Sequence, residues 1–206
     1  MVSSTATTLA YARFARAESE SSSLSVTVIL TANLALLLRL ALLAAIVAPG
    51  VLVMFAPVLG GGLAAGLIAY GITRRRDKGQ SQLTMPPIDN PTELRTALAF
   101  AVLYAAVLLL VAWLTDIAGN NGVFAAALVS GLTDVDAITL SSLRMFGLGT
   151  FPATQATTAI VLAVFANTIF KLGIVLTVGG RGLFRRCAPT LMAEVAGAGV
   201  ILILLT

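Results

Sequence analysis

The sequence predicts an all-α, polytopic transmembrane helix bundle with about six to seven membrane segments of roughly 20 residues each. Hydrophobic residues make up 58% of its 206 residues, whereas charged residues make up only 11%. A soluble domain carries about 25% charged residues, so this chain has too few polar side chains to coat a water-soluble surface. Its mean hydropathy of +0.99 agrees with a protein that lies in a bilayer.

Residue types that are missing or scarce exclude several kinds of site. The chain has no histidine and a single cysteine, Cys187. Histidine catalysis, histidine metal ligation and an internal disulfide are therefore excluded. The net charge of +4 is typical of the basic loops of a membrane protein. We expect a lipid bilayer as the main partner, no nucleic acid, no enzyme activity and no cofactor other than a transported cation.

Five apolar stretches predict full membrane spans, because a helix of about 20 apolar residues crosses the hydrocarbon core. The Pro49-Gly50 pair separates the first two stretches as a turn. The predicted spans are residues 24–47, 51–73, 93–115, 154–178 and the shorter 188–205.

Residues 121–146 differ from these spans because two aspartates, Asp134 and Asp136, interrupt them. Each half has about 12 or 13 residues, and at about 1.5 Å per residue neither crosses a core of about 30 Å. We therefore expect one spanning element that is broken near Gly131. A break at membrane depth is tolerated only where it is buried in protein or lines a cavity.

The placement of arginine and lysine predicts the topology. The polar segment 74–92 begins Arg74-Arg75-Arg76-Asp77-Lys78, and we expect it to be a cytoplasmic loop. Counting the predicted spans from this loop puts Arg13, Arg16, Arg95 and Arg144 on the same side. The same count puts Arg181, Arg185 and Arg186 on the opposite side, against the positive-inside rule.

Short pairs of similar segments predict an internal repeat within a single integral membrane domain, residues 1–206. The stretch from Val2 to Arg13 resembles the stretch from Thr133 to Arg144. Farther along, Ala32-Asn33 recurs as Ala166-Asn167, and Ala56-Pro57 recurs as Ala188-Pro189. We predict two degenerate parallel repeats, residues 1–73 and 93–206, with a broken helix in each. The first copy lacks the half-helix that precedes Asp134 in the second, so we expect the chain to be an N-terminally truncated version of a longer protein.

The strings "VSSTATTLAYAR", "SGLTDVDAITLSSLR" and "FANTIFKLG" resemble a prokaryotic multi-pass membrane domain of unknown function. That domain is usually found C-terminal to an MgtC/SapB domain in one polypeptide. The resemblance implies an inner-membrane location, with an MgtC/SapB domain or a second copy of the chain as partner. It implies no settled activity. In that family a Gly-Leu-rich half-helix precedes the "SSTATT" motif, and this sequence lacks both the half-helix and the MgtC/SapB portion.

Polar residues near the predicted breaks suggest a site for a small cation or another solute. Carboxylate, amide and hydroxyl oxygens suit Mg²⁺ or protons, and discontinuous helices commonly build such sites in transporters. Either Arg39 or Lys171 would neutralise one aspartate. The candidate site residues are Asp134, Asp136, Thr139, Asn167, Lys171, Asn33, Ser3 and Thr5, with Arg39 as charge partner.

An alternative is an accessory or regulatory subunit in which the aspartates only cap a buried helix. Thr133 and Asp136 fit a capping box, with Asp136 reaching back. Glu194 is left open, as either a residue that extends to the interface or a second acidic site. The glycines at 60–62 and Gly66 are expected to permit close helix packing.

Overall fold

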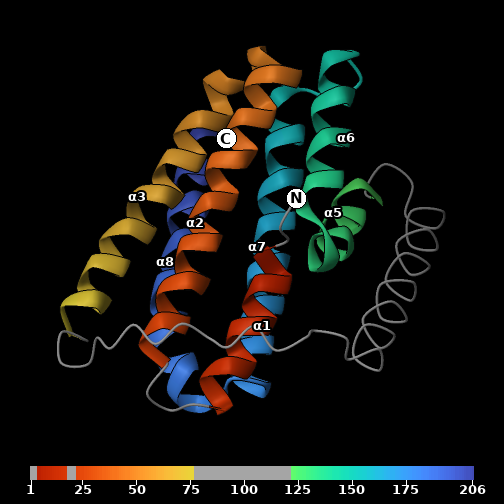
Figure 1. Cartoon of the computed structure of the whole chain (residues 1–206). Helices are drawn as coiled ribbons and strands as arrows, with labels where there is room; N and C mark the ends of the chain where they lie inside the picture. Colours follow the sequence, from red (N-terminus) through yellow and green to blue (C-terminus); the bar gives the residue numbers. More distant parts are fainter. Residues whose placement is uncertain (1–3, 18–21, 77–121) are drawn as a thin grey trace.

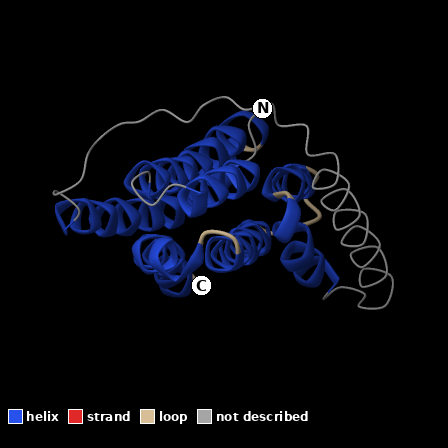
Figure 2. Ribbon diagram, turned by 60° about the horizontal axis from the view of Figure 1, so that its bottom comes forward, coloured by secondary structure: helices blue, strands red, loops and turns tan. Residues whose placement is uncertain are grey.

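The computed structural model describes residues 4–17, 22–76 and 122–206, and this part of the chain is helical (Figure 1). Figure 2 shows helices joined by short loops, with no strand among the described residues. The helices are α1 (Ser4–Ala17), α2 (Ser22–Val47), α3 (Leu52–Arg76), α5 (Gly122–Thr133), α6 (Val135–Gly147), α7 (Ala153–Thr177) and α8 (Gly180–Leu205), with a 3-10 turn at Pro49–Val51.

Four of these helices, α2, α3, α7 and α8, are long and apolar enough to cross a membrane. They confirm four of the five predicted spans, while the span at 93–115 lies outside the described residues. The last helix begins earlier than expected, at Gly180, whose φ of 85° allows the chain to turn directly after α7. Large apolar side chains such as Ile46, Val53 and Ile203 are exposed on the outside, where lipid would cover them.

The two central helices, α2 and α7, run in opposite directions (Figure 1). Leu40 near the end of α2 and Ile160 near the start of α7 belong to one buried apolar cluster. Ile29 near the start of α2 and Val175 near the end of α7 belong to another. The bundle therefore has an apolar core at each end, and α2 and α7 contribute to both.

Helices α3 and α8 also run antiparallel, and glycines bring their backbones close together. A Cβ atom added at Gly197 would lie 2.6 Å from Gly61 O, and one added at Gly62 would lie 2.9 Å from Glu194 O. A Cβ at Gly66 would meet the Leu34 and Glu194 side chains, whereas one at Gly60 would meet nothing within 4 Å. The packing role predicted for these glycines is confirmed for all but Gly60.

The two halves of the broken segment do not cross the membrane in series, which corrects the prediction of one spanning element. Val123 and Phe124 of α5 pack against the cluster that holds the first half of α7, and so does Ile138 of α6. In α6 the chain then runs toward the α2–α3 connection, where Phe146 lies beside Gly50. The chain breaks at Asp134, directly after the predicted break at residues 131–133, but it turns back there as a helical hairpin.

This hairpin also explains why the predicted parallel orientation of the repeats is wrong. A segment that turns back removes one crossing between the two halves of the chain, so every later helix reverses direction. The helices expected to correspond, α2 with α7 and α3 with α8, are accordingly antiparallel. The half-length helices α1 and α6 also run in opposite directions in Figure 1.

The same reversal corrects the predicted placement of the second arginine cluster. The Arg16 guanidinium donates hydrogen bonds to Thr177 O and Val178 O, which places the end of α1 beside the α7–α8 connection. Because α3 is antiparallel to α8, Arg74 and Arg75 at the end of α3 lie at the end of the bundle where α8 begins. Arg181, Arg185 and Arg186 therefore share one end with Arg13, Arg16 and Arg74–Arg76, and Arg144 lies at the other.

Candidate polar site in the bundle interior

The start of α6 is held by Asp134, which has an extended backbone with φ −149° and ψ 115°. Its carboxylate accepts a hydrogen bond from the Asp136 N–H at 2.8 Å, and thereby satisfies one of the amide groups that every helix start leaves open. Asp134, rather than Thr133, is thus the N-cap. The expected capping box is wrong, because Asp136 does not reach back to the cap.

Asp136 instead forms an ion pair with Arg39 of α2. The two side chains are 20% and 30% exposed, so the pair is largely shielded from solvent. Asp136 Oδ1 is buried without a hydrogen-bond partner. The two aspartates therefore have different partners, one a backbone amide and the other a guanidinium, and they do not converge on one cation here.

Asn167 of α7 connects two other elements. Its Nδ2 donates to Gly131 O at 2.9 Å, at the end of α5, and to Thr5 Oγ1 at 3.3 Å, at the start of α1. Its Oδ1 is buried and has no hydrogen-bond partner. The amide side chain therefore holds the ends of two short helices against the middle of a long one.

Two other predicted residues are Thr139 and Ser3. The Thr139 hydroxyl donates to Val135 O at 2.7 Å, within its own helix, although its side chain is buried. Ser3 lies outside the described residues. The Thr139 hydroxyl therefore makes its hydrogen bond within α6 and not to another helix.

The most deeply buried charges lie in a second cluster formed by Lys171, Asn33 and Glu194. The Lys171 ammonium donates to Asn33 Oδ1, and Asn33 Nδ2 donates to Glu194 Oε2 at 2.6 Å. Lys171 is 0% exposed, Glu194 1% and Asn33 2%. One amide side chain from α2 thus bridges a base on α7 and an acid on α8, and the two charges offset each other in a medium that penalises either alone.

Sequence reasoning placed Asn33 and Lys171 at the site but missed Glu194 as their partner. The burial of Glu194 excludes the alternative that its side chain extends to the membrane interface. The signal was present, because an acidic residue inside an apolar span is costly and marks a functional or paired position. What was missing was the crossing of α2, α7 and α8, which the sequence does not give.

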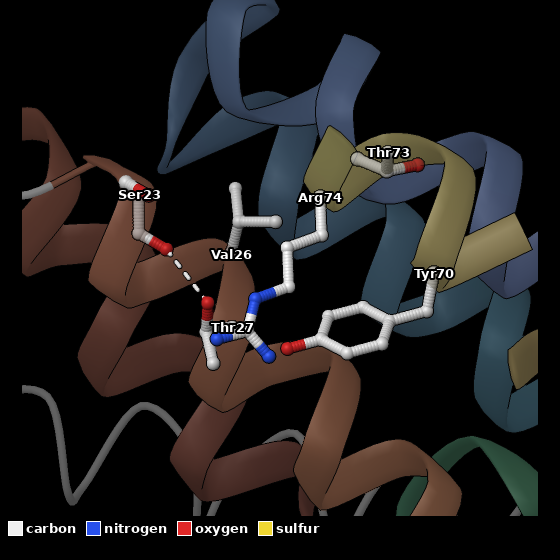
Figure 3. A pocket seen from close by; sticks show the side chains of 6 residues that line it. All are labelled: Ser23, Val26, Thr27, Tyr70, Thr73 and Arg74. Carbon is white, nitrogen blue, oxygen red and sulfur yellow. Dashed lines mark hydrogen bonds between the residues drawn. The ribbon is translucent and has the colours of Figure 1, made fainter. Parts of the chain in front are cut away.

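The described residues offer no ready-made metal centre. No group of three or more His, Cys, Asp or Glu side chains is placed to hold a metal ion within 4–17, 22–76 and 122–206. A small cavity of about 20 Å³, room for about one water, lies at the basic end of the bundle between α2 and α3. Figure 3 shows the Tyr70 hydroxyl and the Arg74 guanidinium extending toward Thr27 there.

Comparison with known proteins gives a relative without an assigned activity. A 96-residue match, 32% identical, joins the chain to an uncharacterised protein of Aquifex aeolicus (strain VF5). It covers 47% of this chain and 42% of that protein, so the chain spans less than half the length of this relative. No solved structure matches the chain.

A family model matches over a far larger part of the chain than this relative does. The model describes a domain of unknown function, DUF4010, and it matches residues 1–179. These residues include every described helix through α7. The protein therefore belongs to the DUF4010 family of domains of unknown function.

Proposed function

We propose that this protein transports a small cation, or lets it permeate, through the polar interior between α2 and α7. The observation that carries the proposal is the series of buried polar contacts along these helices. The Arg39–Asp136 pair, the Asn167 contacts and the Lys171–Asn33–Glu194 bridge follow one another across the middle of an otherwise apolar bundle. Ionisable groups at such a depth are costly, so they are retained where they pair or serve a substrate pathway.

The balance of charge favours a cation over an anion. Among the described interior residues, Asp134, Asp136 and Glu194 are acidic, whereas Arg39 and Lys171 are basic. If all are ionised, the interior carries one excess negative charge that a cation or a proton would neutralise. Three buried oxygens without hydrogen-bond partners, Asp136 Oδ1, Asn167 Oδ1 and Glu194 Oε1, would supply ligands.

An inverted repeat, which we propose for this chain, would support the same function. Under this proposal the unit α1–α2–α3 corresponds to α6–α7–α8 with opposite orientation, and each unit carries its short helix onto the central helix of the other. The contacts are reciprocal, since Thr5 of α1 meets Asn167 of α7 while Asp136 of α6 meets Arg39 of α2. Inverted repeats that enclose a polar site at discontinuous helices are a common plan of transporters.

The arginine-rich end of the bundle is proposed to face the cytoplasm, in accord with the positive-inside rule. In a Cys187→Ser background, single cysteines at Arg75→Cys and Gly182→Cys should react with a membrane-impermeant maleimide from the same side. Thr150→Cys, which is exposed at the other end, should react only from the opposite side. Labelling of Arg75→Cys and Gly182→Cys from opposite sides would contradict this arrangement and restore the topology counted from the sequence.

The proposed function is tested by the elemental content of cells. Cells that express the protein should differ from cells without it in one of Mg, K, Na, Mn or Ca, as measured by mass spectrometry. A cation pathway changes the steady-state content of its ion, whereas an accessory subunit or a purely structural protein does not. Identical profiles with abundant, folded protein in the membrane would count against cation transport.

A second candidate is an accessory membrane subunit, and the role of Asp134 as N-cap favours it. In that case the carboxylate serves only the helix start, and an MgtC/SapB domain or a second copy of the chain would be the partner. Asp134→Asn discriminates between the two, because asparagine caps a helix as well as aspartate does. The accessory role would be favoured by two results together. Cells that express the protein would have the same ion content as cells without it, and the Asp134→Asn variant would behave like the wild type.

A further inference from the structure

We propose that the cavity between the start of α2 and the end of α3, the α2–α3 cleft, binds the phosphate of an anionic phospholipid. Six residues line the cleft: Ser23, Val26 and Thr27 of α2, and Tyr70, Thr73 and Arg74 of α3. The inference goes beyond the proposed transport and does not depend on it. The proposed orientation of the bundle decides only that the lipid belongs to the cytoplasmic leaflet.

Arg74 and Tyr70 give the α2–α3 cleft the hydrogen-bond donors that a phosphate needs. They are four residues apart and therefore share one face of α3. Figure 3 shows the guanidinium and the phenol hydroxyl extending toward Thr27 on the other wall of the cleft. A guanidinium is always charged, and its N–H groups form a planar fork that matches two phosphate oxygens. The phenol hydroxyl adds a further donor.

The two threonines of the cleft use their own protons elsewhere. The Thr27 hydroxyl donates to Ser23 O at 3.1 Å, and the Thr73 hydroxyl donates to Ala69 O at 2.9 Å. Both bonds lie within a single helix, so these side chains shape the walls of the cleft. Arg74 and Tyr70 are therefore the residues on which phosphate binding depends.

The size of the cleft suits a phosphate that enters only in part. Its empty volume is about 240 Å³ with the open mouth included. The part that admits water is about 20 Å³, which is room for about one molecule. A phosphate oxygen is similar in size to a water molecule. One oxygen can therefore occupy the base of the cleft while the rest of the phosphate stays in the mouth beside Arg74, whose side chain is exposed.

The charges around the cleft select an anion. Within residues 4–17, 22–76 and 122–206, the acidic side chains are Asp134, Asp136 and Glu194. Each of them has a partner in the interior of the bundle, so none of the three pairs with Arg74. Arginines of α1 and α8 lie at the same end of the bundle as Arg74. The described part of this end is therefore positive and attracts a negatively charged group.

Apolar side chains next to the cleft favour a lipid over a free phosphate. Leu67 lies one turn from Tyr70 on the same face of α3 and is 50% exposed, and Ile68 beside it is exposed as well. Both residues lie on the side of the cleft that leads toward the middle of the span, where acyl chains would cover them. The cytoplasmic leaflet carries anionic lipids that attract basic residues near the membrane surface. An anionic phospholipid would therefore contact the donors with its phosphate and the apolar side chains with its acyl chains.

Lipid binding by the purified 206-residue chain in a neutral detergent tests the proposal, with native mass spectrometry as the measurement. Dioleoyl phosphatidylglycerol, which is anionic, should bind more tightly than dioleoyl phosphatidylcholine, whose choline adds a positive charge beside the arginines. Arg74→Gln should weaken binding of the first phosphatidylglycerol molecule about tenfold, the effect of losing hydrogen bonds between charged groups. Tyr70→Phe should weaken it less, by about threefold, because it removes one neutral donor.

Arg75→Gln is the matched control. Arg75 is the next residue of α3 and is also exposed, but it does not line the cleft. This variant removes the same charge from the same end, and its binding of phosphatidylglycerol should stay within about twofold of the wild type. Arg74→Lys keeps the charge but replaces the planar fork by a point charge, so it should weaken binding nearly as much as Arg74→Gln. Because both arginines are exposed, all three variants should unfold at the same temperature as the wild type.

Three results would overturn the site. Equal weakening by Arg74→Gln and Arg75→Gln, with no effect of Arg74→Lys, would mean that only the net charge of this end attracts the lipid. Equal binding of the two phospholipids by the wild type would contradict the selection of an anion. Glycerol 3-phosphate carries the phosphate without acyl chains and should not displace phosphatidylglycerol at equal concentration. Displacement would show that a soluble phosphate, and not a lipid, is the ligand of the cleft.

Discussion

Replacing Asp136 by asparagine should abolish the change in cellular cation content that the protein causes. It should also lower the free energy of unfolding. The substitution keeps the size of the side chain but leaves the Arg39 guanidinium without its carboxylate in a largely shielded position. Hydrogen bonds to charged groups contribute about 1.5–3 kcal/mol, so the free energy of unfolding should fall by about 2 kcal/mol. Flux into proteoliposomes and SDS-induced unfolding measure the two effects separately.

The double variant Arg39→Gln with Asp136→Asn separates stability from function. Removing both charges leaves neither uncompensated, so most of the lost stability should return. Flux should not return, because the proposed pathway needs the carboxylate. Recovery of flux together with stability would mean that the pair only holds α6 against α2, and the accessory interpretation would then be favoured.

Adding a single methyl group at Gly131 should disrupt the hairpin between α5 and α6. A Cβ there would lie 2.6 Å from Ala163 Cα and would also meet the Ala163 carbonyl oxygen. Both are backbone atoms of α7, so the clash is relieved only by moving a helix, and the Asn167–Gly131 hydrogen bond would be strained with it. We expect Gly131→Ala to lower the free energy of unfolding by about 2–3 kcal/mol.

Gly173→Ala is the control for this effect. A Cβ at Gly173 would meet nothing within 4 Å, and alanine favours a helix over glycine by about 1 kcal/mol. This variant should therefore be as stable as the wild type or slightly more stable in the same unfolding assay. If Gly131→Ala also proved neutral, the close approach of α5 and α7 would be contradicted.

Much of the local structure could be predicted from the sequence because span length and polarity are local properties. The four long apolar helices occur near their predicted positions, and the break falls at Asp134. The half-helices were recognised because neither is long enough to cross a bilayer. The partner of one of the two aspartates was narrowed to Arg39 or Lys171, since a shielded carboxylate needs a base.

The direction of the helices could not be predicted in this way. A break of one residue, at Asp134, is compatible both with a span that continues and with one that turns back. The choice depends on which half of α7 receives α5, and the Gly131–Ala163 contact sets this. The repeat orientation and the side assigned to Arg181, Arg185 and Arg186 both depended on that choice, so both were wrong for one reason.

The sequence likewise predicted some residues of the candidate site but not how they are joined. Asn33, Asn167, Lys171 and Arg39 stood out because polar residues are rare in apolar spans. The bridge from Lys171 through Asn33 to Glu194 joins residues that are far apart in sequence, and no spacing rule within one helix connects them.

By itself, the sequence determined that this protein is helical, lies in a membrane and interrupts one apolar segment with two aspartates. These properties follow from the free energy of placing each residue in hydrocarbon or water, which is nearly additive along the chain. Only the tertiary structure decided that the chain turns back at Asp134, that the basic residues gather at one end, and that Asn33 bridges Lys171 and Glu194. These depend on close contacts between helices, where one glycine or one amide selects among arrangements of similar hydrophobic burial.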